Sequence, residues 1–137
     1  MKNTPIKVLY IATTRFGLDG MSTVILNYFR AIDKSSIKID LVAPNDVKQE
    51  IRDEFKSYSC DIYKIEGRLN RPYSYYKRLK RLIIENGYDI VHAHGNSATL
   101  FLEMHAARKG GVDVRISHSH NTTCKYKLLD KLLRPLF

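Results

Sequence analysis

The chain has 137 residues, of which 44% are hydrophobic and 27% are charged. This balance fits one globular domain and excludes a disordered chain, because enough apolar surface is present to form a core. Its 23 lysine and arginine residues against 14 acidic ones give a formal net charge of +9. Such a charge favours anionic partners, namely phosphorylated substrates, anionic lipid or nucleic acid, without choosing among them.

The sequence carries no signal for export or membrane insertion. Its apolar runs are far shorter than the roughly 20 residues of a membrane-spanning helix, and Met1–Lys7 is too polar for a signal peptide. Cys60 and Cys124 form no metal-binding or redox spacing. We therefore expect a cytoplasmic protein, and its charge would allow peripheral binding to the inner face of the membrane.

The first half of the chain alternates between strand and helix patterns. Ile6–Ala12 predicts a buried strand, and the glycine-containing loop Thr13–Gly20 follows it. Apolar residues then recur at helical spacing over Met21–Ile32, and Ile37–Ala43 predicts the second strand.

The alternation continues through the middle of the chain. Asp46 is expected to cap the next helix, with Gln49 three residues later as in a capping box. A short third strand is expected at Cys60–Ile65. The helix after it runs over Pro72–Gly87, with proline in its first turn and Asn-Gly at its end.

The last third predicts two more strands and two more helices. Tyr88–Ala93 is the fourth strand, Asn96–Gly111 a helix and Val112–Ser117 the fifth strand, and a final helix runs from Tyr126 or Lys127 to Phe137. Strands and helices in strict alternation predict an α/β fold, a Rossmann-like, doubly wound parallel sheet in the order 3-2-1-4-5. In such a sheet ligands bind beyond the carboxyl ends of the strands.

The loop after the first strand is a candidate anion site. It matches neither the dinucleotide-binding fingerprint nor a P-loop, but Gly17 and Gly20 precede a helix whose free amides and dipole attract negative charge. The alternative is that the two glycines only form a turn.

Four histidines lie on the fourth and fifth strands or just beyond their ends. His92 and His94 share one face of their strand, as do His118 and His120, so neighbouring strands would bring four imidazoles together. A zinc site with Cys124 nearby is one alternative. We favour the simpler reading, with the inner member of each pair hydrogen-bonded in the core, His94 and His120 at the edge of a cleft, and no metal.

Basic and aromatic residues concentrate on the third helix and the loop before it. The basic residues are Arg68, Arg71, Lys77, Arg78, Lys80 and Arg81, and Tyr73, Tyr75 and Tyr76 are interleaved with them. Such a surface suits an anionic membrane interface, and the alternative is a solvated helix face. No nucleic-acid-binding module is recognisable, so nucleic acid is not expected as a partner.

Three segments in order resemble the retaining GT-B glycosyltransferases of family 4. Val8–Ala12, the glycine loop and Gly20–Asn27 resemble the opening of that family. Asp89–Gly95 is similar to its D-(I/V)-(I/V)-H-x-H strand. Arg115–Thr122 resembles the strand that ends in an active-site histidine, above all in capsule and exopolysaccharide transferases.

The resemblance implies a two-domain enzyme that transfers a sugar from a nucleotide-sugar to a glycan or lipid-linked acceptor in polysaccharide biosynthesis. Residues 1–137 would be the acceptor-side domain, and most of the donor site would lie in a C-terminal domain absent from this chain. The nucleotide-sugar is a substrate, so no cofactor is expected. We expect the chain alone to be inactive.

The resemblance also implies roles for individual residues. His120 would lie beside the transferred sugar and act in catalysis, while Gly20 and Gly17 would meet the donor diphosphate. Asp19 replaces the first glycine of the family's Gly-Gly pair, and its carboxylate would repel phosphate unless it turns away. The acceptor would contact His94, Gly95, Asn96 and Asn121.

One alternative from a different class is a non-enzymatic, flavodoxin-like module that binds a nucleotide or another ligand. A regulatory module of this kind would show an acidic cluster and a phosphoacceptor aspartate after the first strand. Thr13, Thr14 and Arg15 stand there instead.

Overall fold

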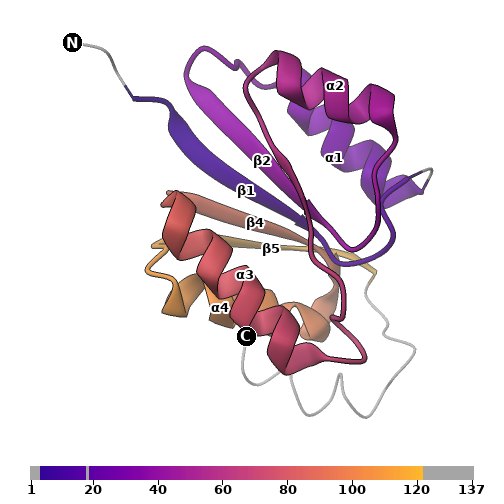
Figure 1. Ribbon diagram of the computed structural model, residues 1–137, viewed down its shortest axis with the longest axis vertical. Helices are drawn as coiled ribbons and strands as arrows, with labels where there is room; N and C mark the ends of the chain where they lie inside the picture. Colours follow the sequence, from indigo (N-terminus) through magenta and orange to yellow (C-terminus); the bar gives the residue numbers. More distant parts are fainter. Residues whose placement is uncertain (1–3, 18, 122–137) are drawn as a thin grey trace.

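Five parallel strands form one sheet in the computed structural model, which describes residues 4–17 and 19–121 (Figure 1). The strands are β1 (Ile6–Ala12), β2 (Ile37–Ala43), β3 (Ile62–Lys64), β4 (Ile90–Asn96) and β5 (Val114–Asn121). The helices are α1 (Gly20–Ala31), α2 (Gln49–Ser57), α3 (Pro72–Asn86) and α4 (Phe101–Lys109), with a 3-10 turn, η1 (Ser97–Leu100), before α4. The predicted final helix and Cys124 lie outside the described residues.

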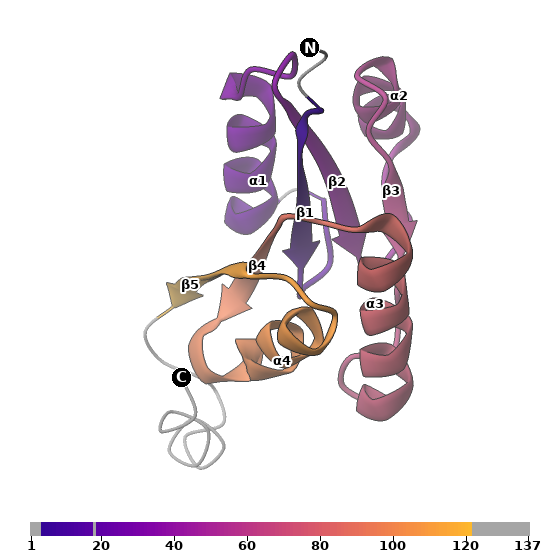
Figure 2. The ribbon, with the colours of Figure 1, turned by 90° about the vertical axis from the view of Figure 1, so that its left-hand side faces the viewer.

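The strand order is β3-β2-β1-β4-β5 with every neighbouring pair parallel, which confirms the predicted fold class and order. Figure 2 shows the arrowheads of β1, β2 and β4 pointing the same way. The chain builds outward from β1 to β3 and then returns to add β4 on the other side of β1. The switch point of the sheet therefore falls between β1 and β4.

The two faces of the sheet support two separate cores, because successive side chains of a strand point to opposite faces. Val8 and Tyr10 of β1 pack with the apolar residues of α1 and α2. Leu9 and Ile11 pack with those of α3 and α4 on the other face. Figure 1 shows these two pairs of helices on opposite sides of the sheet. Burial on both faces explains why β1 reads as a continuous apolar run.

Strands β4 and β5 are longer than the sequence predicted. The predicted ends were Ala93 and Ser117, but the two strands continue side by side, with His94 opposite His118 and a register shift near Asn96. Mutual backbone pairing satisfies the amides and carbonyls of these polar residues, so no apolar side chains are needed to continue the strands. The segments expected to be loops therefore belong to the sheet.

The predicted capping box of α2 is wrong. The helix begins at Gln49 after Lys48, which makes no side-chain capping bond. The carboxylate of Asp46 instead accepts a bond from Nζ of Lys64 at 2.7 Å. The side-chain amide Nε2 of Gln49 donates to Oδ1 of Asp53 within the helix at 2.8 Å. An ion pair to the neighbouring strand β3 thus takes the place of the local cap.

Arg68 does not belong to the predicted basic surface. It is nearly buried, and its guanidinium donates to both carboxylate oxygens of Glu103, at 2.6 and 3.0 Å, and to the carbonyl of Thr99. Glu103 on α4 is fully buried, so its charge requires this partner. Tyr75 is also buried in the core, which leaves it unable to contact a membrane.

The stacked rings of Phe29 and Phe55 join α1 to α2. Their centroids are 3.8 Å apart with an interplanar angle of 6°, and both side chains are fully buried. We expect Phe29→Ala to lower the free energy of unfolding by about 3–5 kcal/mol, because it leaves a cavity and removes the stacking partner. Urea unfolding measures this loss.

Tyr73→Ala on α3 is the matched control, because its ring is 72% exposed and its removal should change stability by no more than about 0.5 kcal/mol. Equal losses in the two variants would show that the stack contributes nothing beyond an ordinary surface residue.

Candidate functional site

The carboxyl ends of β1, β4 and β5 surround a pocket of about 490 Å³. It is lined by Thr14, Asp19, Gly20, Met21, Gly95, Asn96 and His120. Four residues to which the sequence analysis gave a role, Gly20, Gly95, Asn96 and His120, thus line one pocket. The chain separates Gly20 from His120 by most of its length, and both lie at the edge of the sheet where they were expected.

Asp19 is the N-cap of α1, whose first residues line this pocket. Its Oδ1 accepts the backbone amide of Ser22 at 2.8 Å, and the hydroxyl of Ser22 donates to the same oxygen. Partial burial acts to raise the pKa of the Asp19 carboxyl, but the bonds from Ser22 outweigh it and hold the pKa below its usual value. The carboxylate is therefore charged at neutral pH, and it remains on the wall of the pocket.

Gly20 and Gly17 do not share one site. A Cβ added at Gly20, the first residue of α1, would have no atom within 4 Å, so the pocket is open at this point. The amide of Gly17 donates to Oγ of Ser22 at 2.9 Å, and Gly17 lines a different pocket of about 500 Å³. Gly20 is the better placed of the two glycines to meet a ligand beside His120.

Asn45 is a residue of this region for which the sequence suggested no role. Its side chain bonds both backbone groups of Phe16, accepting from the amide at 2.7 Å and donating to the carbonyl at 2.9 Å. It thereby fixes the loop between β1 and α1. Its position two residues after the end of β2, at the carboxyl edge of the sheet, was the signal that could have identified it.

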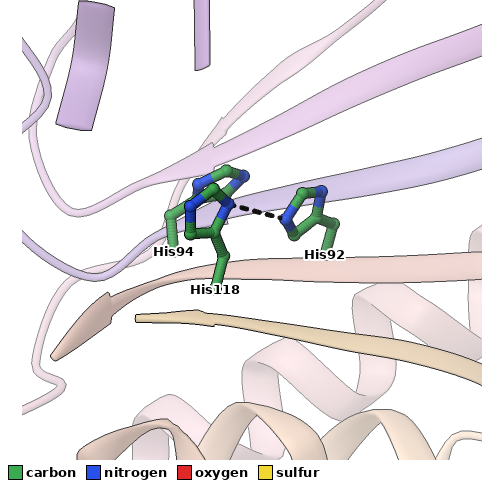
Figure 3. A group of neighbouring side chains, drawn as sticks. All are labelled: His92, His94 and His118. Atoms are coloured by element: carbon green, nitrogen blue, oxygen red, sulfur yellow. Dashed lines mark hydrogen bonds between the residues drawn. The ribbon is translucent and has the colours of Figure 1, made fainter. Parts of the chain in front are cut away.

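The four histidines form one continuous cluster across β4 and β5. Nδ1 of His94 lies 3.2 Å from Nε2 of His120, and Nε2 of His92 lies 3.3 Å from Nδ1 of His118. Figure 3 shows His92, His94 and His118 on the same side of the two strands. The prediction that neighbouring strands gather the imidazoles is confirmed.

The prediction of which histidines lie in the core is wrong. His94 is fully buried, whereas His92 and His118 are partly exposed. The rings of Tyr10 and Tyr28 pack against His94, with centroids 5.5 and 6.5 Å away. His94 is therefore buried next to His120, which it contacts through Nδ1, and it does not line the pocket. Its contact with an acceptor stays a prediction.

Burial controls the charge of this cluster. It lowers the pKa of His94 to about 2 and that of His92 to about 4, and the neighbouring imidazoles add to the effect. Burial and His118 also lower the pKa of His120, although Asp19 acts in the opposite direction. These three rings are neutral at pH 7. Because His94 engages Nε2 of His120, Nδ1 is the atom of His120 that a ligand would meet.

The other predicted acceptor residues lie at the same edge. Gly95 and Asn96 line the pocket. Asn121 pairs in register with Asn96, which places it at the end of β5 beside them. These positions agree with the expected acceptor side, and the contacts themselves stay a prediction.

The basic surface of α3 is separate from this pocket. Arg71, Lys77, Arg78 and Arg81 are exposed and Lys80 is partly exposed. Arg71 and Arg78 line a small pocket of about 280 Å³ at the start of the helix. Among the described helices, none combines the length and the apolar character needed to cross a membrane.

Two comparisons relate the chain to known proteins. The model of the family described as "Glycosyltransferase Family 4" matches residues 18–137, which include Gly20 and His120. The chain is also 33% identical over 115 residues to a Bacillus subtilis (strain 168) protein named "Putative glycosyltransferase EpsF". That match covers 77% of this chain, but it spans only 28% of the length of the Bacillus protein.

Gly95 allows the ends of β1 and β4 to approach closely. Oγ1 of Thr13 donates to the carbonyl of His94 at 2.9 Å, and a Cβ on Gly95 would collide with Thr13 and lie 2.9 Å from Cδ2 of Leu100. We expect Gly95→Ala to lower the free energy of unfolding by about 1–3 kcal/mol through this crowding. Chemical denaturation measures the change.

Gly17→Ala serves as the control, because nothing lies within 4 Å of its added Cβ and its φ is not positive. That variant should be as stable as the original chain or slightly more so. A Gly95→Ala variant as stable as Gly17→Ala would contradict the close approach.

Proposed function

This chain belongs to glycosyltransferase family 4, and we propose that it forms the acceptor-side domain of a retaining enzyme of polysaccharide biosynthesis. The enzyme would transfer a hexosyl group from a nucleotide-sugar to a glycan or lipid-linked acceptor. The observation that supports this proposal is the single pocket that joins Gly20, at the start of α1, to His120, at the end of β5. The non-enzymatic alternative has no comparable observation in its favour.

The start of α1 supplies the proposed contact with the donor diphosphate. Gly20 has no Cβ, so phosphate oxygens can approach the first turn of the helix, where the dipole favours negative charge. Asp19 adds a carboxylate to the same wall, and its bonds to Ser22 keep that charge close to the helix amides. In the proposed complex the diphosphate contacts the backbone at Gly20, while the Asp19 carboxylate stays turned toward Ser22.

His120 is the proposed catalytic residue. Its ring is partly exposed at the pocket and neutral at pH 7, and its Nε2 is hydrogen-bonded to Nδ1 of His94. A fixed, neutral imidazole can hydrogen-bond the transferred sugar or the acceptor hydroxyl through Nδ1. Positioning of the two substrates and stabilisation of the leaving diphosphate would supply most of the rate enhancement. The proposed transfer uses no metal or other cofactor.

The rest of the donor site is proposed to lie in a second domain. The Bacillus relative is several times longer than the matched region, which supports this arrangement. Residues 1–137 alone would then transfer no sugar, because most contacts to the nucleotide would be missing.

The basic face of α3 is proposed to hold the enzyme at an anionic membrane, where a lipid-linked acceptor would be located. Leu69 is 85% exposed and Tyr73 is 72% exposed, and they lie among Arg71, Lys77 and Arg78. Apolar side chains beside exposed cations match the two components of binding to an anionic lipid surface.

The kinetic test uses the complete enzyme. We expect His120→Ala to lower kcat by about 100-fold or more, within the range seen when one catalytic group is removed. Gly20→Val should raise KM for the nucleotide-sugar, since its side chain would enter open pocket space rather than the protein. Steady-state rates with varied donor separate the two effects.

His105→Ala on α4 is the control for this test, because His105 stacks on Tyr76 and Phe101, outside the pocket. All variants are compared by melting temperature. Wild-type turnover by His120→Ala would reject the assignment of His120 while leaving the fold unaffected.

The membrane test uses vesicles with and without anionic lipid. The double variant Lys77→Ala/Arg81→Ala should bind anionic vesicles at least tenfold more weakly, because each basic residue near the surface contributes about 1 kcal/mol. Co-sedimentation at low and high salt measures this binding. Lys56→Ala, an exposed basic residue on α2, should bind as the wild type does. Equal binding to neutral vesicles would contradict the electrostatic component.

A further inference from the structure

We propose that His92, His94 and His118 form a binding site for a divalent transition-metal ion of the zinc class. The three side chains come from β4 and β5 and lie on one side of these strands (Figure 3). Tyr28 of α1 packs against them, and His120 neighbours His94 and His118. The sequence raised zinc only as an alternative, because the inner histidine of each pair was expected to lie in the core and to be hydrogen-bonded there.

The distances between the nitrogens fit a tetrahedral ion with a modest adjustment. One nitrogen from each of the three rings lies within 4.8 Å of the others. Nε2 of His92 and Nδ1 of His118 are 3.3 Å apart, and two nitrogens bound to zinc at about 2.0–2.1 Å are themselves roughly 3.3–3.4 Å apart. Separations of up to 4.8 Å within the trio exceed this spacing, so binding requires an adjustment of side chains within the cluster.

The second observation is a buried nitrogen without a partner. Nε2 of His94 is fully buried and has no hydrogen-bond partner among the described residues. Such a group costs free energy unless something binds it. When Nδ1 of His94 donates to His120, Nε2 carries a lone pair, which is the form that binds a metal. His120 would then act as the outer partner that orients this ligand.

The chemistry of the cluster selects the class of ion. The three candidate ligands are imidazoles, which suit zinc, copper, nickel and cobalt and do not suit magnesium or calcium. An ion held by Nε2 of His92 and Nδ1 of His118 would replace the hydrogen bond between these two atoms. Partial exposure of His92 and His118 gives the ion a path from solvent. Three protein ligands would leave a fourth position for water or an anion.

The test measures binding of Zn²⁺ and Co²⁺ to the full chain, purified without a polyhistidine tag and stripped with EDTA. Calorimetry should show about one Zn²⁺ per chain, and Co²⁺ should give the visible absorption of a tetrahedral site. His92→Gln and His118→Gln should each weaken binding at least tenfold, since even loss of an outer-shell partner costs roughly 10–100-fold. His105→Gln, which keeps all three ligands, should bind as the wild type does.

Melting curves keep the result interpretable. Zn²⁺ should raise the melting temperature of the wild type and of His105→Gln, because an ion that binds the folded state stabilises it. It should not raise that of His92→Gln or His118→Gln, whose circular dichroism shows whether they fold. The proposed site would be overturned if the wild type did not bind one Zn²⁺ per chain. It would also be overturned if His105→Gln lost as much Zn²⁺ affinity as His92→Gln and His118→Gln do. The readout is ion binding, so its failure leaves the proposed sugar transfer untouched.

Discussion

Parallel pairing of β1 with β4 is the constraint on which the rest of this structure depends. It brings together two segments that are far apart in the chain, with Ala12 beside His94 at the carboxyl ends. The backbone amide and the hydroxyl of Thr13 both bond to the carbonyl of His94, and this contact ties the glycine loop to β4. Since β5 pairs with the other edge of β4, the same pairing also places His118 and His120 beside the switch point.

Polar groups in the interior hold the surroundings of the pocket in place. Arg68 and Glu103 join the loop after β3 to α4, and Asn45 fixes the loop after β1. Each of these bonds links segments that are remote in sequence, so each constrains the tertiary arrangement more than the local structure. Removing either Arg68 or Glu103 would leave the other charge buried without a partner, which is strongly destabilising.

The histidine cluster combines two properties in one place. His94 bonds His120 at the edge of the pocket, and its other ring nitrogen, Nε2, is buried without a hydrogen-bond partner among the described residues. His94 therefore belongs to the proposed ion site and also contacts His120, the proposed catalytic residue. The family match covers the pocket residues and the inner three rings alike, so it does not separate their roles.

The sequence by itself determined the order of elements, the bounds of β1, β2 and α3, and the strand order of the sheet. It could do so because apolar periodicity and signals such as the Asn-Gly end of α3 are local, and connection rules leave few topologies. It also predicted that Gly20 and His120 share an edge, since carboxyl ends of parallel strands meet there. Only the tertiary structure decided that His94 is buried, that Arg68 pairs with Glu103, and that β4 and β5 extend through their polar residues. These outcomes depend on which side chains and backbone groups meet across the fold, and a residue's neighbours in sequence do not contain that information.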